Sequence, residues 1–137
     1  MKKEFHKRCD AIEESYEFML AYAAQGVSGD AGSQTGGQLR EYLTRAVTAL
    51  NGLGDLFLSV IDSDALQPAD PYRAYHALLD RDARAAAAAI QLVLAQASIS
   101  SQLVDNLNAS THVRALLTDL FLVDEILNPH VIEPRPA

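Results

Sequence analysis

The chain has 137 residues, of which 49% are apolar and 21% are charged, and its formal net charge is −7. This length and composition predict a single folded domain, and the acidic balance makes nucleic acid an unsuitable partner because its phosphates would be repelled. One cysteine excludes an internal disulfide, and no apolar run is long enough for a secretion signal or a bilayer span, so we expect a cytoplasmic protein with no membrane partner.

Residues 1–25 are expected to form the first helix. Apolar residues recur along them at alternating spacings of four and three, which places them on one helix face: Phe5, Cys9, Ile12, Tyr16, Met19 and Ala23. This pattern is typical of helices that pack in a bundle. Cys9 lies on that face, so we interpret it as a small buried hydrophobe rather than a nucleophile. Gly26 is expected to end the helix.

Residues 26–37 hold five of the seven glycines and are expected to link the first two helices. The segment lacks the lysine of a phosphate-binding loop, the preceding strand of a dinucleotide-binding loop and the acidic oxygens of a calcium loop. One functional interpretation survives, an anion site at the amides of Gly36 and Gly37. We expect instead a mobile link, long enough for a hairpin or for exchange of the first helix between subunits. Thr35, with Gln38 three residues later, fits a capping box for the next helix.

The second helix is expected over residues 38–62. Seven apolar residues follow the same alternating spacing through it: Leu39, Leu43, Ala46, Leu50, Leu53, Phe57 and Val60. The weak point is the sequence Asn-Gly-Leu-Gly at 51–54, because each glycine costs roughly 1 kcal/mol inside a helix. The unbroken pattern favours one continuous helix, and the alternative is a kink or a turn at these glycines.

The third helix is expected over residues 70–107, with Asp70 as its cap and Pro71 in its first position. Its apolar face has a similar spacing: Tyr72, His76, Leu79, Ala83, Ala86, Ile90, Val93 and Ala97. A continuous helix of this length would extend roughly 54 Å at about 1.5 Å per residue, well beyond its neighbours. We therefore expect a bend, first at 98–101, where serines can cap a new start, and second at 80–82.

The fourth helix is expected over residues 110–127 and ends before Asn128 and Pro129. Its apolar face is broad and consists of Val113, Leu116, Leu117, Leu120, Phe121, Val123, Ile126 and Leu127. Residues 128–137 are expected to form an extended tail. Four helices with such faces predict an all-α, up-and-down four-helix bundle that occupies residues 1–137 as one domain.

Apolar residues beside these faces exceed what the helix neighbours within one bundle require. Six of them are the expected interface residues: Leu56, Ile61, Leu92, Ile99, Leu103 and Phe121. Surplus apolar surface commonly marks an oligomer interface, so we expect a homodimer.

No catalytic residue, cofactor or resident metal is expected. No histidine follows a carboxylate by three positions, as the Glu-x-x-His pairs of di-iron bundles require, and no Gly-x-Ser-x-Gly nucleophile motif occurs. His76 and Asp80 are spaced so that they can share a metal with a carboxylate such as Glu17 or Glu41. We prefer to interpret His76 as a hydrogen-bonded, half-exposed residue at the end of the apolar face.

Tyr72, Tyr75 and His76 occupy adjacent turns at the start of the third helix, with Asp80 one turn further. They are the candidate ligand-binding residues, because together they can line a pocket at one end of the bundle, although residues of this kind also form core rims and partner interfaces. The surplus apolar faces and the absence of catalytic motifs favour a non-enzymatic protein-interaction module, such as an assembly factor, chaperone or adaptor. A small-ligand- or metal-binding bundle is the alternative, and an enzyme that uses the same residues ranks last.

Overall fold

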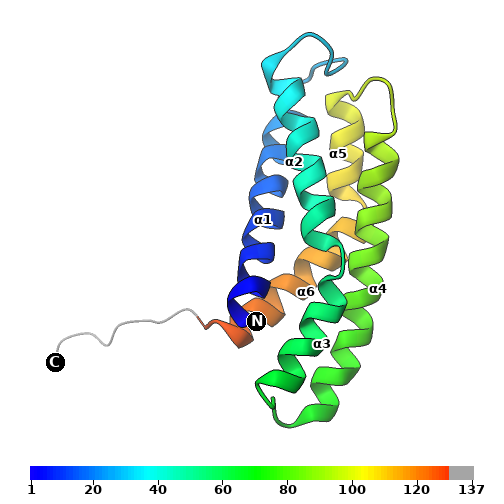
Figure 1. The fold of residues 1–137 in the computed structure, drawn as a ribbon. Helices are drawn as coiled ribbons and strands as arrows, with labels where there is room; N and C mark the ends of the chain where they lie inside the picture. Colours follow the sequence, from blue (N-terminus) through cyan, green and yellow to red (C-terminus); the bar gives the residue numbers. More distant parts are fainter. Residues whose placement is uncertain (130–137) are drawn as a thin grey trace, which may run out of the picture.

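The computed structural model describes residues 1–129, and this part of the chain is entirely helical apart from its connections. Its six helices, shown in Figure 1, are α1 (Lys2–Ala24), α2 (Gln34–Leu50), α3 (Leu53–Ser63), α4 (Ala69–Leu94), α5 (Ser101–Ala109) and α6 (Thr111–Leu127). The all-α prediction is confirmed, but two of the four expected helices are each broken in two. Residues 130–137 of the expected tail lie outside the described part. Within residues 1–129, no helix combines the length and the apolar character needed to cross a membrane.

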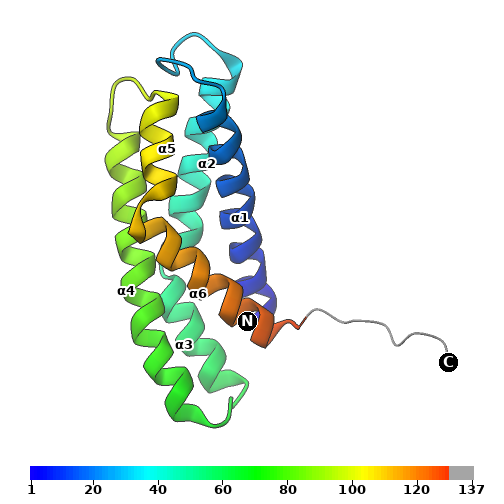
Figure 2. The ribbon, with the colours of Figure 1, turned by 180° about the vertical axis from the view of Figure 1, so that it is seen from behind.

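The helices pack side by side as a bundle in which α4 runs along most of the length of the molecule (Figure 1). α2 and α3 follow one another along one side of α4, and α1 packs against α2 and α5. α6 crosses this arrangement obliquely and contacts both α4 and α1 (Figure 2). The end of α6 therefore comes close to the start of α4, and this crossing positions the site described below.

The continuous helix expected over residues 38–62 is wrong, because the chain turns between α2 and α3. Asn51 is extended, and Gly52 has a φ of 72°, a left-handed conformation that glycine adopts without steric cost. Gly54 then packs so closely on α4 that an added Cβ would overlap the side chain of Asp80. The apolar pattern itself is confirmed, since all seven residues of the expected face are buried. The face persists through the break because both α2 and α3 pack against α4.

The bend expected at 98–101 is confirmed as the connection between α4 and α5. The side chain of Ser100 accepts a hydrogen bond from the backbone N–H of Leu103 and caps the new helix, as expected for a serine at this place. The second candidate bend, 80–82, lies inside the continuous α4. Gly26 follows α1 with a φ of 66°, in agreement with its expected role at the helix end.

Two helix starts differ from the expected ones. α2 is capped by Ser33, whose hydroxyl accepts a hydrogen bond from the backbone N–H of Gly36, and Thr35 lies inside the helix. α4 is preceded by Pro68 at its N-cap position, so Asp70 lies in the first turn and does not cap the helix. A carboxylate in the first turn still interacts favourably with the positive end of the helix dipole.

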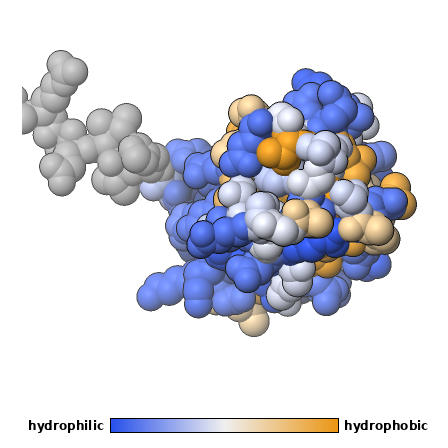
Figure 3. Space-filling view, turned by 90° about the horizontal axis from the view of Figure 1, so that it is seen from above, coloured by the Kyte–Doolittle hydropathy of each residue, from blue (hydrophilic) through white to orange (hydrophobic). Residues whose placement is uncertain are grey.

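Polar contacts hold the 26–37 segment, which we expected to be a mobile link. The carboxylate of Asp30 accepts a hydrogen bond from the backbone N–H of Ile99 at 2.7 Å and another from Arg40 at 2.5 Å. Arg40 also donates to the carbonyl oxygen of Leu94, at the end of α4. The segment is therefore tied to the connection between α4 and α5. Figure 3 shows this end of the molecule, where hydrophilic residues surround scattered apolar ones.

The buried face of α1 differs from the expected one towards its C-terminal end. Up to Ile12 the expected residues are buried, but further along Ser15 and Tyr22 are buried more deeply than Tyr16 and Ala23. The difference arises because α5 packs on this part of α1 and its start covers Tyr22, whose hydroxyl donates a hydrogen bond to the carbonyl oxygen of Ile99.

The expected interface residues do not form one surface. Ile61 and Ile99 are buried in the core of the chain itself, so they offer nothing to a partner. Leu56 and Leu103 are half-buried against the core. Leu92 on α4 and Phe121 on α6 are exposed, with relative exposures of 67% and 57%.

Candidate functional site

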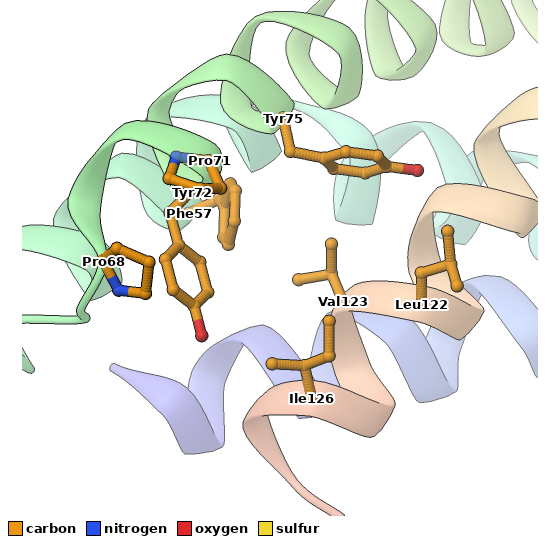
Figure 4. Close-up of a pocket in the computed structure, with 8 residues that line it drawn as sticks. All are labelled: Phe57, Pro68, Pro71, Tyr72, Tyr75, Leu122, Val123 and Ile126. Atoms are coloured by element: carbon orange, nitrogen blue, oxygen red, sulfur yellow. The ribbon is translucent and has the colours of Figure 1, made fainter.

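An apolar groove of about 380 Å³ lies between the start of α4 and the end of α6 (Figure 4). Eight residues line it: Phe57, Pro68, Pro71, Tyr72, Tyr75, Leu122, Val123 and Ile126. Its volume lies within the range of roughly 300–1,000 Å³ that is usual for ligand sites. Of the candidate ligand-binding residues, Tyr72 and Tyr75 lie in this groove.

The local sequence explains both walls of the groove. Pro71 lies in the first turn of α4, where its missing N–H has no helical partner to lose. Tyr72 and Tyr75 follow on one face of α4, because residues three apart in a helix are neighbours. Leu122 and Ile126 are four apart on α6 and share a face for the same reason.

The rim of the groove exposes large apolar side chains. Leu122 and Ile126 have relative exposures of 51% and 59%, whereas Val123 and Phe57 are buried. The neighbouring Phe121 is also exposed. Exposed apolar residues grouped in this way, beside a concave apolar surface, are typical of binding sites rather than of general protein surface.

Tyr75 connects the groove to a buried carboxyl group on α6. Its hydroxyl donates a hydrogen bond to Oδ1 of Asp119 at 2.7 Å. Asp119 is only 5% exposed, and its Oδ2 has no hydrogen-bond partner within residues 1–129. Burial and the nearby carboxyl of Asp82 raise the pKa of Asp119 to about 7. Burial and the charge of Asp119 also raise the pKa of Tyr75 to about 12.

The other two candidate residues lie outside the groove. The ring of His76 stacks on Phe57, with a centroid distance of 6.5 Å, and its Nε2 is buried with no hydrogen-bond partner in the described part of the chain. Asp80 faces α3, against Gly54, and its carboxylate pairs with Arg84 at 3.0 Å. The four candidate ligand-binding residues therefore do not form one site: Tyr72 and Tyr75 line the groove, whereas His76 and Asp80 lie outside it. Across residues 1–129, no group of three or more His, Cys, Asp or Glu side chains is placed to hold a metal ion.

A second polar contact fixes the end of α6 on α1. Nδ1 of His6 lies 3.0 Å from both carboxylate oxygens of Asp124, and its Nε2 lies 3.4 Å from Asp10. The hydrogen bond and the charge of Asp124 raise the pKa of His6. Cys9 lies nearby and is fully buried, and burial raises the pKa of its thiol. A protonated, buried thiol is a poor nucleophile, which supports its interpretation as a core residue.

Sequence reasoning missed the α6 side of this site. Leu122 and Ile126 carry an apolar signal in the sequence, but it does not indicate which helix they face. Asp119 sits inside an apolar stretch, between Leu117 and Leu120, and a carboxylate at such a place is the one signal that could have identified it.

Comparisons with protein-family models, with curated proteins and with solved structures found no match to this chain.

Proposed function

We propose that this protein is a non-catalytic interaction module that binds the apolar face of a partner helix in the groove between α4 and α6. The observation that carries the proposal is the groove itself, an apolar hollow whose rim leaves Leu122 and Ile126 half exposed. A groove between two helices suits an amphipathic helix, whose apolar side chains recur every three or four residues. Roles as an assembly factor, a chaperone or an adaptor are all consistent with this mode of binding.

The energetics of burial support binding at this place. Burying one leucine or isoleucine side chain contributes roughly 1.5–3 kcal/mol, and a partner helix would bury Leu122 and Ile126 together with its own anchor residues. Association costs oppose this gain, so we expect an affinity in the micromolar range, which corresponds to about −8 kcal/mol.

The homodimer expected from the sequence remains a proposal, and a second copy is a competing occupant of the groove. The net charge of −7 disfavours it, because two copies of an acidic chain repel each other. Light scattering of the purified protein decides the question. A dimer that Ile126→Asp dissociates would assign the groove to self-association and would contradict a separate partner.

A designed peptide tests the proposed function. The probe is a dye-labelled synthetic helix with leucines spaced three and four apart and alanine and glutamine elsewhere, and its binding to the full chain is measured by fluorescence anisotropy. Ile126→Asp should weaken binding at least about tenfold, because it places a charge on the apolar rim. Leu92→Asp, a matched change of an exposed apolar residue on α4, should change affinity by less than about twofold.

Two outcomes would contradict the proposal. The peptide would either fail to bind the wild-type chain or bind the Ile126→Asp and Leu92→Asp variants equally well. Circular dichroism of both variants shows whether they remain folded. If Ile126→Asp does not fold, Leu122→Gln replaces it, since its side chain is also half exposed and a neutral amide perturbs folding less.

A small apolar ligand is a second candidate occupant, favoured by the rings of Tyr72 and Tyr75 on one wall of the hollow (Figure 4). Titration with a neutral aromatic probe, 1-naphthol, distinguishes this case. Saturable binding of 1-naphthol that is lost in Tyr72→Ala, together with no binding of the peptide, would favour the small-molecule function.

A further inference from the structure

The groove ends at a pair of carboxyl groups. On α4, Tyr72, Tyr75 and Asp82 are spaced so that they share one face, and on α6 the same holds for Asp119 and Ile126. The hydrogen bond from Tyr75 to Asp119 shows that these two faces meet. In Figure 4 the hydroxyl of Tyr75 points away from the proline end of the groove, towards the side where Leu122 lies. Asp82 and Asp119 therefore lie beyond the apolar part, at the opposite end from the prolines.

This carboxyl pair lacks a well-placed cation. Oδ2 of Asp119 is buried and has no hydrogen-bond partner within residues 1–129. Arg81 contacts Asp82 at 3.4 Å, but the Arg81 side chain is 71% exposed, and its charge lowers the pKa of Asp119 less than burial and Asp82 raise it. The side chain of Asp82 is 13% exposed, so the pair meets the surface on its Asp82 side. An ionised carboxylate that is buried beside a second carboxyl is unfavourable, and a bound cation would lower that cost.

We infer that the partner helix carries a lysine or arginine that binds the Asp82–Asp119 pair while its apolar side chains fill the groove. This inference rests on the proposed function and specifies the chemistry of the partner. A cationic side chain can donate charge-assisted hydrogen bonds to the partly exposed Asp82, and its positive charge then lies beside Asp119. Asp119 and Ile126 are seven residues apart, about 10 Å along α6, so the cation should lie two helical turns from the apolar anchor at Ile126.

The protonation of the pair supplies a readout that simple apolar binding lacks. The groups that act on Asp119 are Tyr75, Asp82 and Arg81, all from α4. Because the pKa of Asp119 is raised to about 7, this carboxyl holds a proton at neutral pH for part of the time. A bound cation favours the ionised form, so the affinity for a lysine-bearing helix should rise between pH 6 and pH 8. Lysine itself stays charged throughout this interval.

Two peptides that differ at one position test the inference. Both carry the leucine pattern of the probe above, and one has lysine and the other glutamine two turns from the first leucine. At pH 8 the lysine peptide should bind the wild-type chain about tenfold more tightly, and this ratio should fall at pH 6. Asp119→Asn should reduce the ratio of the two affinities to about one, because it removes the charge that the lysine binds. Asp105→Asn, which removes an exposed carboxylate on α5, should preserve the ratio.

Each outcome separates the inference from the proposed function. If both peptides bind the wild-type chain equally and Ile126→Asp weakens both, the cation site is wrong and the groove function stands. If Asp105→Asn lowers the ratio as much as Asp119→Asn does, the effect comes from overall charge, and the site is again wrong. If neither peptide binds, both proposals fail. Asp82→Asn provides a second test of the pair should the Asp119 variant not fold.

Discussion

The hydroxyl of Tyr22 donates a hydrogen bond to the carbonyl oxygen of Ile99 at 2.6 Å, across 77 residues of sequence. Beside it, the hydroxyl of Ser101 donates to the carbonyl of Tyr22 at 2.6 Å and accepts from the backbone N–H of Val27 at 2.9 Å. These bonds join the end of α1 to the start of α5. They also satisfy backbone groups that would otherwise be buried without partners at this end of the molecule.

Removing the Tyr22 hydroxyl should therefore destabilise the fold. Tyr22→Phe leaves the buried carbonyl of Ile99 without its donor, so we expect the free energy of unfolding in urea to fall by about 1–2 kcal/mol. Tyr42→Phe is the control, because it removes a hydroxyl from a half-buried ring and keeps the stacking of that ring on Phe18. Equal stability of the two variants would contradict the importance of the Tyr22 hydrogen bond.

Glycine should be required for stability at position 36 but not at position 37. A Cβ at Gly36 would overlap the backbone carbonyl of Asp30, while a Cβ at Gly37 would meet no atom within 4 Å. Gly36→Ala should lower the free energy of unfolding by about 1–3 kcal/mol, because the backbone must shift. Gly37→Ala should raise it by roughly 0.5–1 kcal/mol, because alanine favours the helix. The matched pair is measured by urea denaturation, and a stabilised Gly36→Ala variant would disprove the close contact.

Asp30 should contribute stability that depends on pH. The hydrogen bond from Arg40 lowers the pKa of Asp30 below its usual 3.8, so its stabilisation is present above that pH and is lost as the pH falls through the lowered value. In chemical denaturation, Asp30→Asn should cost about 1.5–3 kcal/mol at pH 7, and this cost should shrink as the pH falls through the lowered pKa of Asp30. Asp62→Asn, which removes an exposed ion pair with Arg73, should cost under about 1 kcal/mol across this pH range. If Asp30→Asn lost the same stability at every pH, the result would argue against an ion pair between Asp30 and Arg40.

Asp119 should have the opposite pH dependence. Because its pKa is raised from 3.8 to about 7, the folded state favours the protonated carboxyl, and the stability of the wild-type chain falls as the pH rises from about 4 through 7. Asp119→Asn keeps the shape without the charge, so it should be more stable than the wild type at pH 8 by on the order of 2–4 kcal/mol. At pH 4 the two should be nearly equal. Thermal melts at both pH values measure this, and a destabilised variant at pH 8 would show that the ionised carboxylate is favourable.

His6 should stabilise the contact between α1 and α6 at acidic pH. Its pKa is raised by Asp124, so the stabilisation is present below pH 6.5 and is lost as the pH rises through the raised value. The side chain is 46% exposed, so His6→Asn should cost less than about 1 kcal/mol at pH 5.5 and nearly nothing at pH 9. His112→Asn, at an exposed position on α6, is the control and should show no such difference. An equal effect of the two substitutions in thermal melts would contradict the His6–Asp124 contact.

Local patterns were sufficient to predict which residues form helices and most of those they bury. The face from Leu39 to Val60 is buried as expected, because apolar spacing depends only on helix geometry. The break at Gly52 was not decided locally, since two glycines cost only roughly 2 kcal/mol in a helix, a sum that packing readily outweighs. The close approach of Gly54 to Asp80 belongs to the contact between α3 and α4, which is not a local property.

The candidate site divides in the same way. The sequence alone identified the apolar faces, the break before Ser101, and Tyr72 and Tyr75 as neighbours on one turn of helix. Only the tertiary structure brought Asp119 to Tyr75, across 44 residues, and separated Asp80 from both tyrosines. The physical reason is that helical periodicity determines which side of each helix is apolar, whereas the oblique crossing of α6 over α4 determines which apolar sides meet and where a groove stays open.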